Sequence, residues 1–380
     1  MRCQLRLVLA LSLFLVPMSL RAFQSTSEES IRAALAAHAV PLRGAGQERL
    51  LAEARNHDFF LLGELHGETE IPALLRDLWP ELWQIGYHHV AAEVSPWAAE
   101  HLERNGPHDA TPIVALWTYD QAAVVRHFAA PDQTVLWGCD IDEGQPQRLI
   151  LDIAALNPED AGLQQMVKIS GHGYNRAQAS ELLRIADADH PARDAIFGGI
   201  SLWQNVRDTL RIETLRSSPA TKLAASESRE LLMKRLFLAR YEKEGDGKVL
   251  LRFGRNHLHR GYDARGVSTL GNFVTEWALA KNKSVFNVGV FAAGGKEHLP
   301  GETFDADERK DELTFALLAN LAGSNATLFD LRPLRPVLHA IASGKRTSLE
   351  ANLVYWADSY DFLLCYPTVS PLAKGGGANQ

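Results

Sequence analysis

One stretch of ten residues, DFFLLGELHG at positions 58–67, constrains the fold more than any other part of the chain. Its four apolar residues, 59–62, run into Gly63 without a polar break, which is typical of a strand buried on both faces in a parallel sheet. Glu64 and His66 follow in a turn that closes at Gly67. We therefore expect both side chains at the carboxyl end of a core strand, where open α/β sheets bind their ligands.

The segment after this turn has the apolar spacing of an amphipathic helix. Its apolar stripe consists of Ile71, Leu74, Leu75, Leu78 and Leu82. Arg76 falls between these positions, so its guanidinium lies either along the helix flank toward the turn or toward water. Pro80 is expected to kink or end the helix.

Further predicted strands also end in polar residues. The strand at 89–94 ends in Glu93, and the strand at 134–141 carries Asp140 near its end. A strand at 249–253 runs into a polar loop, 254–261, and later strands are expected at 284–291, 326–330 and 361–366. Because strands and helices alternate, we predict an α/β fold with a central, mainly parallel sheet flanked by helices.

Two other segments depart from this alternation. Residues from about 146 to 245 show helical apolar spacing and no clear strand, which predicts a helical cap insertion over one end of the sheet. Such an insertion either shapes a pocket or forms a peripheral subdomain. Residues 292–311, with mixed charge and several glycines, are expected to form a surface loop or flap.

The ends of the chain predict its location. Residues 1–22 combine two arginines with a short apolar run and small residues, the pattern of a cleavable secretory signal; an uncleaved anchor is the alternative. Residues 23–370 are expected to form one α/β domain, and the Gly-rich tail, 371–380, to be disordered. We therefore predict a secreted or periplasmic protein with no stable membrane anchor after signal cleavage.

Composition narrows the possible partners. A formal net charge of -7 argues against a nucleic-acid partner and leaves a small-molecule substrate as the expected one. Cys139 and Cys365 lie in apolar runs and are expected to be buried free thiols, although an oxidising compartment would permit a disulfide if the strands met.

The polar strand ends suggest hydrolytic chemistry. A histidine with a carboxylate partner can take a proton from water near neutral pH, a second histidine can protonate the leaving group, and Arg76 or Arg255 can stabilise an oxyanion. His257 and His259 alternate on an extended segment, so at most one faces the site, and we expect it to be His257.

Two other kinds of chemistry have weaker signals. A serine nucleophile is disfavoured because the sequence has no Gly-x-Ser-x-Gly motif. Glu64, His66, Glu93 and His257 are credible zinc or manganese ligands, yet the His-Glu-x-x-His spacing is absent, so no metal site is predicted.

Several motifs along the chain resemble those of one known family. They are GELHGETE at 63–70, Arg76, VAAEV at 90–94, WGCDID at 137–142, RFGRNHLHRG at 252–261, LFDLRPL at 328–334 and YDFLLCYPTVSP at 360–371. Together they resemble the erythromycin esterase family, within the superfamily that includes ChaN-like haem-binding lipoproteins and the TIKI and TraB proteins. One residue, Leu65, separates the first glutamate from the histidine, where the esterases have two.

The resemblance implies a metal-independent, esterase-like hydrolase without a cofactor. By this resemblance His66 acts as general base on water, supported by Glu64, Arg76, Glu93 and His257. Asp140, Arg255, Asn256 and His259 are expected to contact the substrate. The alternatives are a ChaN-like protein that binds haem or a divalent metal, with Arg255, His257 and His259 favouring an anionic cofactor, and a metal-dependent peptidase of the TIKI/TraB type.

Overall fold

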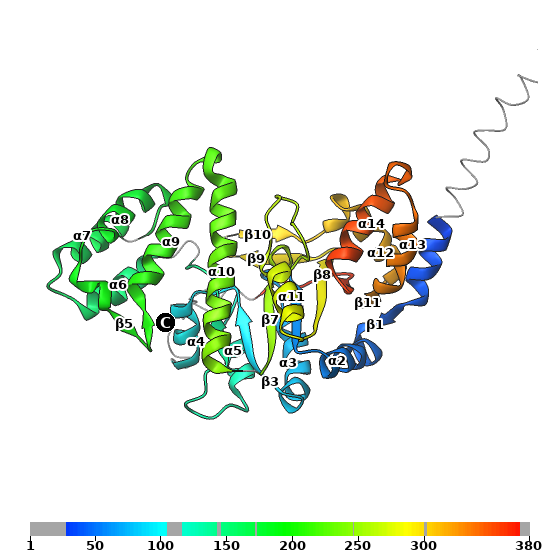
Figure 1. Ribbon diagram of the computed structural model, residues 1–380, viewed down its shortest axis with the longest axis horizontal. Helices are drawn as coiled ribbons and strands as arrows, with labels where there is room; N and C mark the ends of the chain where they lie inside the picture. The colour runs from blue at the N-terminus through cyan, green and yellow to red at the C-terminus, as the bar shows by residue number, and fades with distance from the viewer. Residues whose placement is uncertain are drawn as a thin grey trace, which may run out of the picture.

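The computed structural model describes residues 28–104, 116–142, 146–171, 173–245, 247–299 and 302–372. An eight-stranded sheet lies at the centre of an elongated molecule (Figure 1). Its strand order is β1-β11-β12-β8-β2-β7-β3-β4. In chain order the strands are β1 (Ala39–Pro41), β2 (Phe59–Glu64), β3 (Tyr87–Ala92), β4 (Leu136–Gly138), β7 (Lys248–Gly254), β8 (Val285–Ala292), β11 (Thr327–Asp330) and β12 (Phe362–Tyr366).

The sheet is mixed but mostly parallel, which confirms the predicted α/β class. Neighbouring strands from β12 through β8, β2, β7 and β3 to β4 run parallel, whereas β11 and β1 are antiparallel at one edge. The DFFLLGE segment forms β2 between β7 and β8, and every residue of β2 is buried. The carboxyl ends of β2, β7, β3 and β4 therefore share one edge of the sheet.

Alternate residues of β2 face opposite helical layers. Phe59 and Leu61 belong to an apolar cluster with α10 and α11, whereas Phe60 and Leu62 belong to a cluster with α2 and α3. This alternation follows from the two-residue period of a strand. The helices packed around the sheet are α2 (Gln47–Asn56), α3 (Glu70–Gln84), α4 (Pro96–Arg104), α5 (Tyr119–Arg126), α10 (Lys222–Glu244), α11 (Leu270–Ala280), α12 (Leu313–Ala322), α13 (Arg335–Ala340) and α14 (Ser348–Ser359).

Residues 146–244 are mainly helical, and most of them form a lobe beside the β4 edge of the sheet (Figure 1). The lobe contains α6 (Pro146–Leu156), α7 (Ala161–Ser170), α8 (Ala179–Ala186), α9 (Leu202–Arg216) and the short strands β5 (Ile196–Phe197) and β6 (Ile200–Ser201). The long helix α10 returns from the lobe and lays Met233, Phe237 and Tyr241 against the sheet. The segment therefore joins the core through α10.

A helix whose described part spans residues 28–37 precedes β1. Two local predictions were wrong. Helix α3 does not end at Pro80 but continues to Gln84. The segment predicted as a loop at 292–311 contains an antiparallel hairpin, β9 (Lys296–Leu299) and β10 (Glu302–Asp305), which lies above the end of β7 in Figure 1.

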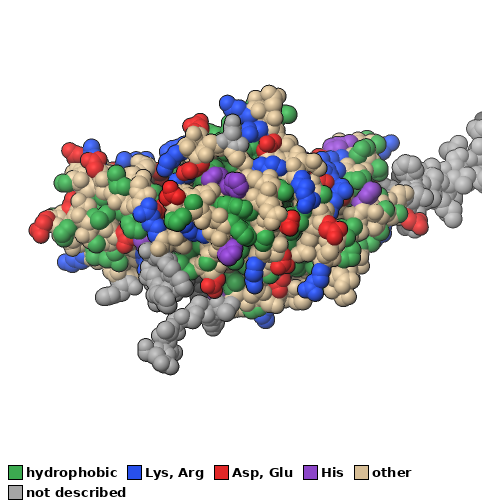
Figure 2. All heavy atoms as spheres, turned by 90° about the horizontal axis from the view of Figure 1, so that it is seen from below, with side chains coloured by type: hydrophobic (Ala, Val, Ile, Leu, Met, Phe, Trp, Pro, Cys, Tyr) green, Lys and Arg blue, Asp and Glu red, His purple; other side chains and the backbone are tan. Residues whose placement is uncertain are grey.

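The remaining predictions divide into those that were tested and those that were not. Cys139 and Cys365 are buried free thiols, as expected. The signal segment 1–22 lies outside the described residues, and so does the predicted disordered tail from residue 373 onward. Within the described ranges, no helix combines the length and apolar character needed to span a bilayer. On the face shown in Figure 2, acidic and basic side chains are interspersed with apolar ones.

Candidate active site

Glu64, His66 and Glu93 meet at the carboxyl edge of the sheet. Glu64 is the last residue of β2, and Glu93 directly follows β3. Strand β7 separates β2 from β3, so the two carboxylates approach each other across its end. His66 Nδ1 lies 3.9 Å from Glu64 Oε1, and His66 Nε2 lies 3.7 Å from Glu93 Oε2. The imidazole is thus placed between two buried carboxyl groups.

His66 is the accessible member of this group. Its side chain is 29% exposed, against 1% for Glu64 and 4% for Glu93. Gly254, the last residue of β7, makes room for the ring, because a Cβ at this position would lie 2.5 Å from His66 Nε2. The same Gly254 donates its backbone N–H to Glu93 Oε2 at 2.6 Å. The absence of a side chain at position 254 therefore lets the strand touch both groups.

Glu93 is held as an anion. Burial alone would raise its pKa, but the neighbouring His257, His66 and Arg229 outweigh that effect and hold the pKa of Glu93 well below its ordinary value. Arg229 Nη2 on α10 donates to Glu93 Oε1 at 2.8 Å, and His257 Nε2 lies 3.3 Å from the same oxygen. Glu93 consequently carries a fixed negative charge beside His66.

His257 is fixed in its protonated form. It lies in η5 (Arg255–His257), where its Nδ1 is 2.5 Å from Glu230 Oε1 and its Nε2 faces Glu93. Burial would lower its pKa, yet the two carboxylates raise the pKa of His257 to about 10. Glu230 also accepts a hydrogen bond from the backbone N–H of Leu270, at 2.8 Å. An imidazolium between two anchored carboxylates supplies positive charge at neutral pH.

Glu64 has a different environment from Glu93. Its Oε2 accepts a hydrogen bond from Arg252 Nε at 2.5 Å, and the Arg252 guanidinium also lies over the Trp117 ring at 4.5 Å. Burial outweighs the attraction of Arg252 and raises the pKa of Glu64. The other oxygen, Glu64 Oε1, is buried and has no hydrogen-bond partner. The two carboxyl groups beside His66 therefore have pKa values shifted in opposite directions.

The acidic residues after β4 support this arrangement from behind. Asp140 binds the Arg229 guanidinium through both carboxylate oxygens, so Arg229 links Asp140 to Glu93. Asp142 accepts a hydrogen bond from the Ser95 hydroxyl, and burial raises its pKa to about 7. Asp140 is almost fully buried, and it acts on the site through the Arg229 side chain.

A cavity of about 310 Å³ opens in front of these groups. We call it the strand-end hollow; it is lined by Glu64, Leu65, His66, Gly254, Arg255, Asn256, His257, Glu297, Leu299, Asp305, Ala306, Asp307, Glu308 and Asp311. The residues come from the end of β2 and the turn after it, from the end of β7 and η5, and from the region that follows β8. The helical lobe contributes none of the residues lining this hollow, although α10 supplies Arg229 and Glu230 behind it.

The other predicted site residues are placed unequally. Asn256 is exposed and lines the strand-end hollow. Arg255 also lines it, but its guanidinium is paired with Glu308 at 2.5 Å and stacked on Phe315. The positive charge of Arg255 is therefore already balanced by the carboxylate of Glu308.

Two predicted site residues lie elsewhere. His259 is buried, with Nδ1 at 2.9 Å from Ser359 Oγ and Nε2 at 3.2 Å from the Tyr355 hydroxyl, so only His257 of the alternating pair faces the site. Arg76 is exposed on α3 and lines a separate depression with residues of α5, including Asp120. The structure therefore does not bring Arg76 to the histidine, and Arg252 supplies the guanidinium beside Glu64.

Sequence reasoning missed Arg229, Glu230 and Arg252. Arg252 interrupts the apolar run of β7, and a charge inside a buried strand requires a buried partner. Arg229 lies on the same helical stripe as Ala225, Met233 and Phe237, although it is charged. In both α10 and β7, a charged residue among apolar positions was the sequence feature that could have indicated a buried ion pair.

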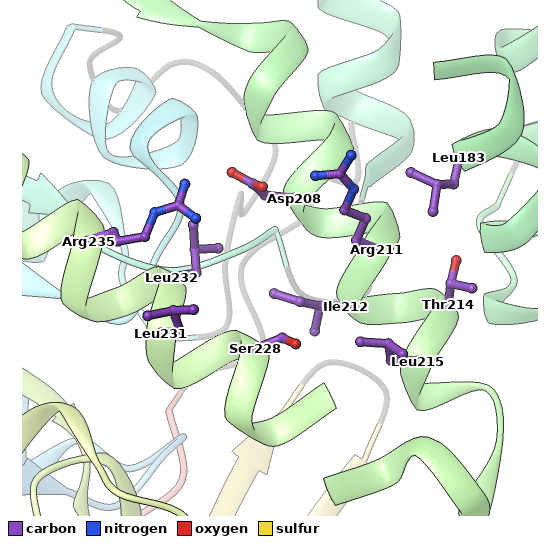
Figure 3. Close-up of a pocket in the computed structure, with 10 residues that line it drawn as sticks. All are labelled: Leu183, Asp208, Arg211, Ile212, Thr214, Leu215, Ser228, Leu231, Leu232 and Arg235. Carbon is purple, nitrogen blue, oxygen red and sulfur yellow. The ribbon is translucent and has the colours of Figure 1, made fainter. Parts of the chain in front are cut away.

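A second cavity, of about 380 Å³, lies between α9 and α10 in the helical lobe (Figure 3). Leucine and isoleucine side chains line it, together with Asp208, Arg211 and Arg235. None of the ten residues drawn there is a histidine or a glutamate. The acid–base groups thus gather at the strand-end hollow. Within the described part of the chain, no grouping of three or more His, Cys, Asp or Glu residues forms a metal-binding cluster.

No protein-family model and no curated protein matches the sequence. Solved structures do match. An erythromycin esterase EreC variant in its open conformation has a TM-score of 0.58 at 13% identity, covering 86% of this chain and 95% of that chain. A protein from Bacillus cereus has a TM-score of 0.56 at 15% identity, with 90% and 98% of the two chains covered. A succinoglycan biosynthesis protein has a TM-score of 0.54 at 15% identity, with 90% and 97% covered.

These similarities extend over most of the chain. The resemblance drawn from the sequence motifs is confirmed at the level of the fold. The chain has the same overall fold as these solved structures, that of the erythromycin esterase EreC among them.

Proposed function

We propose that this protein hydrolyses an ester, or a related acyl bond, of a small molecule, with His66 as the general base that activates water. The observation that carries the proposal is the position of His66, a partly exposed imidazole between two buried carboxyl groups at the mouth of a cavity. A histidine held in this way can accept a proton near neutral pH.

The two ring nitrogens have different partners. Nδ1 is buried, and both it and Glu64 Oε1, 3.9 Å away, have no other hydrogen-bond partner. A small closing movement would let Nδ1–H donate to Glu64, which leaves the lone pair on Nε2. The Nε2 to Glu93 Oε2 distance of 3.7 Å is too long for a direct hydrogen bond, so the Nε2 lone pair is left for a water in the cavity.

In the proposed step, this water loses its proton to His66 Nε2 as its oxygen attacks the acyl carbon. The tetrahedral intermediate then collapses, the bond between the acyl carbon and the leaving oxygen breaks, and the His66 imidazolium returns the proton to the departing alcohol. Glu93, which keeps its negative charge, stabilises the imidazolium that forms. The exposed amide of Asn256 lines the hollow and is the candidate donor to the oxyanion. The imidazolium of His257 adds positive charge behind Glu93, so that the ionised carboxylate tolerates its buried position.

The test is His66→Asn measured on a panel of p-nitrophenyl esters and lactones. EreC is by name an erythromycin esterase, so a macrocyclic lactone belongs in the panel. We expect kcat/KM to fall by about 10²- to 10⁴-fold, the usual contribution of a general base. The matched control is His127→Asn, because His127 is exposed and lines a different depression.

Circular dichroism and thermal unfolding would show that both variants keep the fold. A folded His66→Asn protein with undiminished activity would refute His66 as the base. If the wild-type protein hydrolyses no member of the panel, the proposed reaction class is wrong.

The proposal includes export, because the signal pattern at residues 1–22 predicts a secreted or periplasmic location. Amino-terminal sequencing of the protein recovered from the periplasm or medium would test it. A mature chain that begins near residue 23 supports export, whereas a full-length chain retained in the cytoplasm contradicts it.

A further inference from the structure

Arg252 is a charged residue within the buried part of β7. Its neighbours Leu251 and Phe253 face the layer formed by α10 and α11, so the two-residue period of the strand turns Arg252 to the opposite face, together with Leu250. Arg252 is only 3% exposed. A guanidinium is costly to bury unless its donors are paired, and an apolar residue often stabilises such a position equally well. Packing alone therefore does not explain this arginine.

One short segment holds the far end of the Arg252 side chain. This segment, residues 116–121, contains the start of α5, and we call it the α5 clamp. Arg252 Nη1 donates to Gln121 Oε1 at 2.7 Å, and Nη2 donates to the carbonyl of Leu116 at 3.4 Å. The guanidinium carbon lies 4.5 Å from the centre of the Trp117 ring. Because Gln121 and Trp117 are themselves buried, the guanidinium is held in one orientation.

In this orientation the remaining donor of Arg252, Nε, points at Glu64. Nε donates to Glu64 Oε2 at 2.5 Å, which leaves Oε1 as the oxygen that faces His66 Nδ1 at 3.9 Å. The other titratable groups that face this carboxyl group are His66, Glu93 and Glu68. Arg252 is therefore the permanently charged neighbour that favours the ionised form of Glu64.

We propose that Arg252 and the α5 clamp are positioning elements for the general base, and that they decide which ring nitrogen of His66 carries the proton. An ionised Glu64 can only accept a hydrogen bond, so it selects the tautomer with the proton on Nδ1 and the lone pair on Nε2. A neutral Glu64 can instead donate to Nδ1 and leave the proton on Nε2. That second tautomer cannot accept a proton from water at Nε2.

The tautomer can be measured without turnover, whereas the link to catalysis rests on the proposed function. Long-range ¹H–¹⁵N NMR over a pH series shows which nitrogen of the neutral His66 ring is unprotonated, and we expect Nε2 in the wild-type protein. In Arg252→Met the buried Glu64 loses its cation and should take up a proton, so the ring should change to the other tautomer. Arg335→Met is the matched control, because Arg335 is also paired with a carboxylate, Asp361, and does not line the strand-end hollow.

The catalytic consequence is measured on the panel of esters and lactones. Arg252→Met should lower kcat by about 10²- to 10⁴-fold and change KM by less than about threefold, because Arg252 does not line the cavity. Arg252→Lys restores a charge but not the planar contacts, so we expect partial recovery of kcat. Gln121→Met, which loosens the α5 clamp, should lower kcat by about 3- to 10-fold. Arg335→Met should leave kcat and the tautomer unchanged.

The inference is overturned if the neutral His66 ring of the wild-type protein carries its proton on Nε2. It is also overturned if a folded Arg252→Met protein keeps the wild-type tautomer, even with reduced activity, because the arginine would then be merely structural. Should Arg252→Met fail to fold, Arg252→Gln removes the same charge but keeps an N–H donor, and a wild-type tautomer there contradicts the inference equally.

The two proposals fail in distinguishable ways. If the tautomer changes in Arg252→Met but the wild-type protein hydrolyses no member of the panel, the positioning role stands and the ester-hydrolase proposal fails. If Gln121→Met keeps the wild-type kcat, the α5 clamp has no part in positioning the base.

Discussion

The His257 imidazole shows how the surroundings of one residue decide its chemical role. The carboxylates of Glu93 and Glu230 face its two ring nitrogens and outweigh the effect of burial. With a pKa of about 10, this ring is charged throughout the physiological range and cannot alternate as an acid and a base at pH 7. His66, which is accessible and lies at the hollow, is left as the residue for proton transfer.

Glu230→Gln tests this difference directly. The amide keeps an oxygen for the Leu270 N–H but removes one negative charge from His257, so we expect the pKa of His257 to fall by about 1 to 3 pH units. The measurement is a titration of the His257 ring by ¹H–¹⁵N NMR. The wild-type ring should show no transition between pH 6 and 8. A wild-type transition in that range would contradict the assigned charge.

For single residues, the sequence predicted the site side chains at strand ends better than the site side chains on helices. Glu64, Glu93 and His257 meet because parallel strands end at one edge, a regularity that can be read from strand-like runs. Arg76 was misplaced because helical spacing does not say which flank of α3 faces the site. Arg229 was missed because its approach to Glu93 depends on how α10 packs on the sheet, which no local pattern records.

Among the elements, β4 packs closely against a neighbouring turn. Gly138 ends β4, and a Cβ there would overlap the carbonyl group of Ser95, where the chain leaves β3 for α4. The backbone of Ser95 cannot move freely, because Ser95 also caps α4 and binds Asp142. The glycine is thus needed for close backbone approach.

Gly138→Ala should consequently lower the free energy of unfolding by about 3 kcal/mol, as overpacking of a rigid core does. Urea denaturation provides the measurement. Gly344→Ala is the matched control, because nothing lies within 4 Å of a Cβ at that position. It should change stability by less than about 1 kcal/mol. Equal effects of the two substitutions would show that the Ser95 backbone yields.

Helix α3 and the hairpin β9–β10 show where element prediction failed. Helix α3 passes Pro80 because Leu78, Trp79 and Leu82 are buried on one face, and this packing outweighs the backbone hydrogen bond that proline cannot make. The hairpin was taken for a loop because its residues are polar, and β10 is exposed throughout. A strand that buries neither face has no alternation to detect.

For the whole molecule, the buried ionisable groups favour mildly acidic conditions. Burial raises the pKa of Glu68 to about 8 and those of Asp142 and Glu297 to about 7. The folded state therefore keeps protons that the unfolded chain loses above about pH 4.5, so each group costs stability as pH rises toward its folded value. His257 acts in the same direction, because its stabilisation is complete below about pH 6.5 and is lost toward pH 10.

We thus expect the free energy of unfolding to decrease steadily from pH 6.5 to 9, measured by urea denaturation in one buffer series. The lowered pKa values of Glu93 and His259 change stability only at lower pH. In Glu68→Gln the decline should be shallower by about 1.4 kcal/mol per pH unit up to pH 8, because the amide mimics the neutral acid. An unchanged slope in Glu68→Gln would contradict the raised pKa of this residue.

The overall architecture could be predicted from the alternation of strands and helices, but the antiparallel edge could not. Strand β1 has three residues and pairs with β11, near the other end of the chain. A three-residue segment ending in proline has no distinctive pattern, and its pairing is decided by tertiary contacts. The lobe was predicted as helical, yet its docking through Arg229 depends on long-range geometry.

The placement of β2 has a consequence for biosynthesis. Phe59 belongs to the first long strand to leave the ribosome, but it pairs with Val249 on one side and Val285 on the other. The nascent FFLL segment must wait, with its backbone unpaired and its apolar side chains exposed, until most of the polypeptide has been translated. Such delayed pairing makes folding slow and favours self-association. The nascent polypeptide should therefore depend on chaperones that shield this segment until β7 and β8 arrive.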